Sequence, residues 1–304
     1  MLKRVVMIAV VFALSGAVLH AEGEEVKPAS PPPLPCIMVE GTGGIFITPT
    51  AYLVNPSQGD EWLGLPSVAF SYASIGDKDF TSVGATMTFF KRIEVGVAHE
   101  RFGLGSWPRD VLNATGLNVR DQTVRMNTVN LRALVLEEKD WLPAVTAGVH
   151  YKHNEDIWCV DLDLLGGCSA LGVKDNDGWE FTLTASKTFV GILPRPFILT
   201  AGLRNTDAAQ TGLLGFTGHR DTVFEGNAIF FITDQLLLAG EYRQKPDRLK
   251  RLPGLLGKED DWWTLCAGYV VNDRVTLAAG YGNFGNVLNN REDRVWAVHV
   301  KFEF

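Results

Sequence analysis

Trp296-Ala-Val-His-Val-Lys-Phe-Glu-Phe304 is the last stretch of the sequence, and apolar side chains occupy every second position of it. The positions between them carry His299, Lys301 and Glu303. A helix repeats its faces every 3.6 residues and would mix these polar side chains with the apolar ones. The stretch therefore predicts a β-strand with one apolar and one largely polar face.

Eleven earlier segments repeat the same alternation. They are residues 68–72, 83–89, 93–97, 129–135, 145–151, 179–185, 197–203, 224–232, 236–242, 263–271 and 275–281. With their ends they approach the roughly 9–11 residues that cross a bilayer as a tilted strand. The sequence thus predicts twelve membrane-crossing strands.

The connections between these segments alternate in length. Short ones include Lys91-Arg92 and Asn272-Asp273, and long ones include 103–122 and 154–177. Only the tight hairpin at Gly76-Asp77-Lys78 departs from this order. Outer-membrane barrels have short periplasmic turns and long external loops, and an even number of strands leaves both chain ends in the periplasm.

A soluble β-sandwich is the alternative to a membrane barrel. Two observations weigh against it: one face is apolar in every segment, and large aromatic residues gather at segment ends, as at a membrane interface. The expected aromatic belt consists of Tyr72, Tyr151, Trp179, Tyr242, Trp263, Tyr281 and Trp296. Hydrocarbon offers no partner to an unpaired backbone N–H, so the sheet must close. Residues 66–304 are predicted to form an all-β, antiparallel up-and-down transmembrane barrel.

Three segments precede the predicted barrel. Residues 1–21 have the charged start, apolar stretch and small-residue end of a cleaved signal peptide, although a short membrane anchor is an alternative. Residues 22–40 are rich in proline and predict an extended periplasmic tether or, alternatively, a ligand for a proline-binding module. Residues 41–65 are too apolar to lie free, and Pro49 suits only an edge or bulge. We expect this segment at the periplasmic mouth or in the lumen.

The polar face of the predicted strands defines the candidate lumen lining. It comprises Glu94, Arg132, His150, Lys152, Glu180, Arg204, Glu225, Glu241, Arg243, His299, Lys301 and Glu303. The mixed signs favour internal salt bridges, with a selectivity ring as the alternative. Eight strands give a filled interior and 16–18 an open channel, so twelve predict a narrow or occluded path.

Four cysteines occur in a chain that we expect to mature under oxidising conditions. Cys159 and Cys168 lie in one predicted external loop, and we predict a disulfide between them. Cys36 and Cys266 remain, and a bridge between these two would require the N-terminal segment to enter the barrel.

No cofactor or metal site is predicted. The acidic loop residues Glu155, Asp156, Asp161 and Asp163 do not match a calcium-loop spacing, so we expect a solvated loop.

No catalytic residue is assigned. A lipid-modifying enzyme remains a rival hypothesis, and His99, near an outer strand end, is its best candidate.

The composition narrows the class further. With 46% hydrophobic residues and a net charge of −7, the chain is neither intrinsically disordered nor basic enough to suggest nucleic-acid binding. The expected partners are outer-membrane lipid and the machinery that assembles barrels, and we expect a monomer.

Two resemblances support this interpretation. The terminal Phe302 and Phe304, with apolar residues alternating before them, resemble the C-terminal assembly signal of Gram-negative outer-membrane barrels. Residues 43–52, 130–136 and 141–148 resemble a group of Gram-negative barrel proteins of unknown function, with a GGxxxTPTAY-like segment. That group implies no substrate or active site. Passage of small solutes through a narrow pore is the expected function, with a structural or receptor barrel as a further rival.

Overall fold

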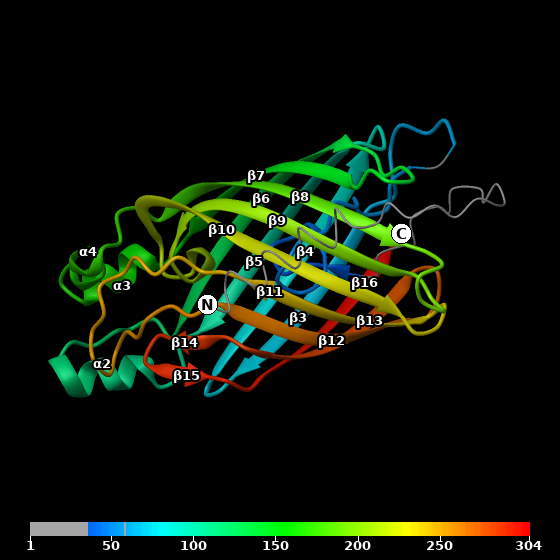
Figure 1. Cartoon of the computed structure of the whole chain (residues 1–304). Coiled ribbons are helices and arrows are strands. Elements are labelled where there is room, and N and C mark those ends of the chain that lie inside the picture. Colours follow the sequence, from blue (N-terminus) through cyan, green and yellow to red (C-terminus); the bar gives the residue numbers. More distant parts are fainter. Residues whose placement is uncertain (1–35, 58) are drawn as a thin grey trace.

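The structure is a computed structural model that describes residues 36–57 and 59–304, and its main body is a closed barrel of twelve antiparallel strands (Figure 1). The barrel strands are β3 (Ser67–Ile75), β4 (Lys78–Phe89), β5 (Ile93–Gly103), β6 (Thr123–Leu136), β7 (Ala144–Asn154), β8 (Asp177–Phe189), β9 (Phe197–Ala208), β10 (Phe216–Phe231), β11 (Leu236–Arg243), β12 (Trp262–Val270), β13 (Val275–Asn283) and β16 (Val295–Glu303). The predicted fold class is confirmed.

The barrel is up-and-down, because each strand pairs with its neighbours in sequence. Closure comes from β16 and β3, in a register that sets Val298 opposite Tyr72 and Lys301 opposite Ala69. This pairing leaves no free sheet edge, which a membrane interior requires. A small hairpin of β14 (Gly285–Val287) and β15 (Asn290–Glu292) separates β13 from β16.

Strand alternation turns an apolar face outward. Exposed side chains of this face include Leu131, Leu183, Leu265 and Val298, each about half exposed. The predicted belt residues are exposed or half-buried, and several contact one another: Tyr281 packs against both Trp263 and Trp296. The outer surface is therefore an apolar band edged by aromatic rings, as hydrocarbon contact requires. Within the described residues, no helix has the length and apolar character needed to cross a membrane.

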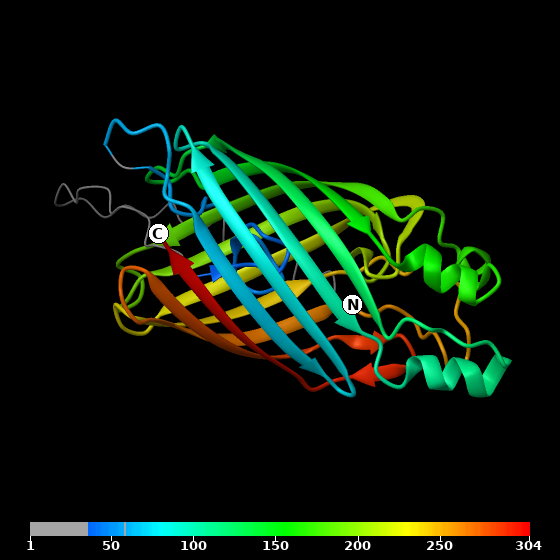
Figure 2. The ribbon, with the colours of Figure 1, turned by 180° about the vertical axis from the view of Figure 1, so that it is seen from behind.

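The two mouths of the barrel differ. Short turns and the C-terminus lie at one mouth, and the long connections extend from the other (Figures 1 and 2). These connections carry α2 (Trp107–Thr115), α3 (Ile157–Asp163), α4 (Gly167–Leu171) and the 3₁₀ turn η1 (Ala209–Gly212). We refer to this as the helical mouth.

The tight hairpin between β3 and β4 also reaches the helical mouth. Gly76 has a φ of +62°, which favours glycine, and a Cβ there would lie 2.1 Å from a Glu292 carboxylate oxygen and displace that side chain. Lys78 is buried and its ammonium contacts the Glu292 carboxylate at 3.1 Å. The β14–β15 hairpin thus covers this short connection and neutralises its buried charge.

The apolar band gives a stability prediction. Leu131→Arg on β6 places a guanidinium against hydrocarbon and is expected to lower the free energy of unfolding from lipid vesicles by about 2–4 kcal/mol. Denaturant titration measures this free energy of unfolding. Leu162→Arg, on the exposed side of α3, is the control and should change little. A Leu131→Arg variant as stable as the wild type would contradict the membrane-facing assignment.

Candidate functional site: a plugged lumen and two apolar cavities

The predicted lumen residues lie inside the barrel. Eleven of the twelve are buried, and Glu303 is half-buried beside Lys301, with which it forms an ion pair. On β5 the alternation is plain: Glu94 is fully buried, whereas Ile93 and Val95 are exposed. The inward side chains do not face an open channel, because another segment of the chain occupies the lumen.

Residues 36–57 fill the lumen, and we call them the plug. The plug is drawn in blue inside the strands in Figures 1 and 2. Every residue from 36 to 54 except Val39 is buried. Its two short strands, β1 (Cys36–Ile37) and β2 (Gly43–Gly44), pair with each other. The chain then runs to the short-turn mouth, where Gly64 donates its N–H to Thr88 O at 2.7 Å.

Gly41 brings the plug against β5. Its φ is +81°, and a Cβ on it would lie 2.5 Å from Val97 O. The facing Gly96 is equally restricted, since a Cβ there would lie 1.9 Å from Gly41 O. The plug and the wall therefore meet backbone to backbone at this point, and neither glycine tolerates a side chain.

Glu94 and Arg132 hold one part of the plug. The Glu94 carboxylate accepts the N–H of Gly43 at 3.2 Å and that of Val54 at 2.8 Å. Arg132 donates to Gly43 O at 2.9 Å and to Thr50 O, and it contacts Glu94 at 3.1 Å. The Glu94–Arg132 ion pair of the wall thus forms hydrogen bonds with both N–H and C=O groups of the plug backbone.

Glu241 holds the middle of the plug. Its carboxylate accepts the backbone N–H groups of Phe46, Ile47 and Thr48 at 3.2, 3.0 and 2.8 Å. The hydroxyls of Thr48 and Thr264 also donate to it, at 2.8 and 2.6 Å. Successive N–H groups that converge in this way form an anion-binding concavity. Here the anion comes from the wall and the concavity from the plug.

Glu40 joins a buried charge cluster. Its carboxylate lies 2.7 Å from Lys152, 3.0 Å from Arg243 and 3.2 Å from Arg204. Glu180 and Glu225, on the wall, contact Arg204 at 2.6 and 2.9 Å. Three cations therefore face two wall carboxylates and one plug carboxylate. Sequence reasoning gave Glu40 no role, and only its position in the fold reveals one.

Two histidines bear on the enzyme hypothesis. His99 points outward and its Nδ1 lies 2.8 Å from Asn127 Oδ1. His299 is buried in the lumen with its Nδ1 2.8 Å from the Ser71 hydroxyl, but its Nε2 has no partner among the described residues. The Ser71–His299 pair therefore lacks the orienting carboxylate of a catalytic triad.

The predicted disulfide is wrong. Cys159 and Cys168 are both free thiols, as are Cys36 and Cys266. The physical reason is that the loop folds into two helices: Cys159 lies on the exposed side of α3, whereas Cys168 is buried on α4. Burial raises the pKa of the Cys168 thiol to about 12.

The acidic residues of this loop have protein partners. Asp156 receives the Arg125 guanidinium at 2.6 Å, and Asp161 accepts the Ser169 hydroxyl at 2.7 Å. Hydrogen bonds from Arg120 hold the pKa of Asp163 below its usual range. Within the described residues, no group of three or more His, Cys, Asp or Glu side chains is arranged to hold a metal ion.

An apolar cavity of about 270 Å³ lies among the helices of the helical mouth, and we call it the outer cavity. Among the described residues that line it, none is charged and only Thr115 carries a hydroxyl. The lining comprises Leu104, Trp107, Val111, Thr115, Leu117, Val124, Ile157, Val160, Leu164, Gly167, Cys168, Ala170, Leu171, Val173, Leu214, Leu249, Leu252, Leu255, Leu256 and Leu288.

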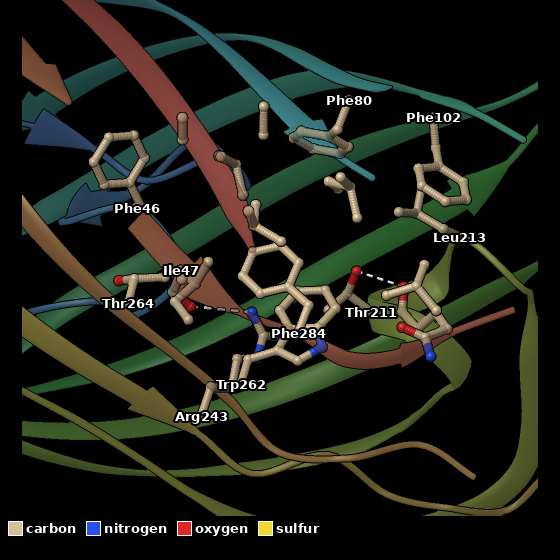
Figure 3. A pocket seen from close by; sticks show the side chains of 18 of the residues that line it. Phe46, Ile47, Phe80, Phe102, Thr211, Leu213, Arg243, Trp262, Thr264 and Phe284 are labelled. Atoms are coloured by element: carbon tan, nitrogen blue, oxygen red, sulfur yellow. Dashed lines mark hydrogen bonds between the residues drawn. The ribbon is translucent and has the colours of Figure 1, made fainter. Parts of the chain in front are cut away.

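A second cavity, of about 60 Å³, lies inside the barrel between the plug and the wall, and we call it the inner cavity (Figure 3). Phe46 and Ile47 of the plug line one side, and Phe80 and Phe102 of the wall line it together with Phe284, which follows β13. Leu214 and Leu288 line both cavities. The lining is mostly apolar, although Glu40, Glu100 and Arg243 also contribute to it. So many apolar side chains are unusual in a lumen, since the interior of a membrane barrel is normally polar.

The plugged, closed twelve-stranded barrel defines the class of fold. The chain belongs to the family described as "Protein of unknown function (DUF3034)", whose model matches residues 35–301. This confirms the expected membership in a family of unknown function, while the GGxxxTPTAY-like segment as its mark stays a prediction. The comparison with curated proteins found no match.

Solved structures of outer-membrane barrels are similar to this chain at low identity. The KdgM porin shares 9% identity, with a TM-score of 0.47 over 78% of this chain and 99% of that one. The NanC porin shares 10%, with a TM-score of 0.47 over 79% and 100%. Omp33 of Acinetobacter baumannii shares 12%, with a TM-score of 0.43 over 81% and 100%.

The contacts of Glu241 give a prediction about the plug. Glu241→Gln keeps one acceptor oxygen but removes the charge from three N–H donors, and hydrogen bonds to charged groups contribute about 1.5–3 kcal/mol. We expect plug displacement to become roughly ten- to a hundredfold more frequent. The measurement is the rate of maleimide labelling at the buried Cys36 in a Cys159→Ser background, read by mass spectrometry.

Thr276→Val is the matched control. Thr276 is a buried lumen residue on β13 that makes no hydrogen bond to the described residues of the plug, so loss of its hydroxyl should leave the Cys36 rate unchanged. Equal labelling rates in the wild type and Glu241→Gln would show that this carboxylate does not hold the plug.

Proposed function

We propose that the protein is an outer-membrane channel for small solutes, closed in this conformation by its own plug. The observation that carries the proposal is how the wall binds the plug. Glu94, Arg132 and Glu241 bond to plug backbone groups rather than only to one another. Removing the plug would therefore uncover these polar wall groups, together with the apolar wall residues against which Ile45, Phe46 and Ile47 pack.

The charge cluster supports reversible closure. With the plug in place, Glu40 balances the third cation of the cluster formed by Lys152, Arg204 and Arg243. With the plug displaced, these three cations would keep the wall carboxylates of Glu180 on β8 and Glu225 on β10 but lose that of Glu40. The loss of this negative charge favours return of Glu40. Water entering the lumen would solvate the uncompensated cation and lower the free energy needed to displace the plug.

The location follows from the same proposal. The helical mouth would face the outside, because long connections are external in outer-membrane barrels. Residues 1–21 would be the cleaved export signal, and they lie outside the described residues. Phe302 and Phe304 would be read by the assembly machinery, and lipid would cover the apolar band of a monomer.

Conductance in planar lipid bilayers tests the channel. The wild type should open rarely, because the plug is held by several buried hydrogen bonds. Glu241→Gln should open more often and pass solute faster in liposome swelling, and a chain lacking residues 36–57 serves as a second variant. Thr276→Val should behave as the wild type. The proposal would be abandoned if all folded variants, including the plug deletion, gave neither conductance nor swelling.

A further inference from the structure

We propose that the outer cavity binds a small, uncharged, apolar molecule about the size of a substituted benzene ring, and that this is the class of solute the channel takes. The transport part of this inference rests on the proposed function. The binding part does not, because the cavity exists while the plug is in place.

The size and lining of the outer cavity define the ligand. A dry apolar cavity of about 150 Å³ binds benzene, and this one has about 270 Å³. Its walls come from the apolar faces of α2, α3 and α4, with Trp107, Val111 and Val160 among them. The Trp107 indole N–H is already bonded to Leu255 O at 2.8 Å. The cavity thus offers neither a charge nor a free strong donor, and a charged ligand would be left unpaired.

The outer cavity has access to the surface. Three of its lining residues, Thr115, Ala170 and Leu252, are exposed, and they come from three different connections. A molecule could therefore enter between these connections without unfolding the helices. The position at the helical mouth places the cavity where a solute would first meet the barrel.

Leu214 and Leu288 line both cavities and separate the outer one from the inner one. The backbone is strained at Leu288, with a φ of +59°, and in the η1 turn that precedes Leu214, where Gln210 and Thr211 have φ values of +45° and +63°. Side-chain-bearing residues rarely adopt such conformations, and strain of this kind gathers at ligand clamps and switches. Gln210 links the two segments by donating to Asn286 O at 3.1 Å. We therefore assign Leu214 and Leu288 as the partition that a solute would pass.

The inner cavity continues the path toward the plug. Phe46 and Ile47, whose N–H groups Glu241 holds, form its plug side (Figure 3). Two of its buried lining groups, Glu100 Oε1 and Trp262 Nε1, have no hydrogen-bond partner among the described residues. They could receive one small polar group of an otherwise apolar solute. Displacement of the same plug turn would enlarge this cavity and open it to the lumen.

Fluorine NMR of fluorobenzene added to the full-length protein in detergent micelles tests the binding site. We expect a bound resonance that saturates at one equivalent, separate from the micelle signal. Val160→Trp fills the cavity from α3 and should abolish this resonance. Leu162→Trp, on the exposed side of the same helix and outside the lining, should keep it. Ala170→Trp is a second filling variant if Val160→Trp does not fold.

A charged analogue tests the ligand class. 4-Fluorobenzoate should give no saturable resonance, because its carboxylate would be buried without a partner. Lack of a saturable fluorobenzene signal in the folded wild type, its survival in both filling variants, or equal binding of 4-fluorobenzoate would each overturn the inference. If fluorobenzene binds but neither the wild type nor the plug-deleted variant conducts, the channel and the transport part fail and the binding site stands. If the protein conducts without binding fluorobenzene, the binding site and the solute class fail and the channel stands.

Discussion

The structure depends on how the barrel wall satisfies the buried backbone of the plug. A segment with little regular secondary structure can lie buried in a lumen only if its N–H and C=O groups find partners. Glu241 supplies one acceptor to three consecutive N–H groups, and Glu94 supplies acceptors to Gly43 and Val54. The buried carboxylates in turn avoid isolation because the plug backbone and Arg132 bond to them. The wall and the plug therefore each need the other to satisfy their buried polar groups.

The lumen combines a polar part and a mostly apolar part. In the polar part, charged and polar wall groups bind the plug backbone and surround Glu40. In the other part, mostly apolar side chains of the wall, the plug and the loops line the two cavities, although Glu40 and Arg243 also line the inner one. The turn at Phe46 and Ile47 lies at the boundary, because its backbone bonds to Glu241 and its side chains line the inner cavity. Movement of this one turn would alter both parts together.

The barrel was predictable from sequence because strand alternation is local: a stretch such as 296–304 shows its two faces without knowledge of its partners. The buried positions of Glu94 and Arg132 follow from the same period. The bonding of Glu241 to Thr48 joins residues 193 positions apart, so no local pattern reports it. Glu100 continues the inward period of β5 and could have been found. The outer cavity and the failed Cys159–Cys168 prediction both depend on loop helices, whose packing has no simple sequence period.

Amide hydrogen exchange in the folded wild type tests the central claim most directly. If the wall holds the plug, the N–H groups of Phe46, Ile47, Thr48 and Val54 should exchange about as slowly as those of the barrel strands, because each is buried and bonded to a carboxylate. Exchange of these four amides at the rate of an unprotected chain, while the strands stay protected, would contradict the account.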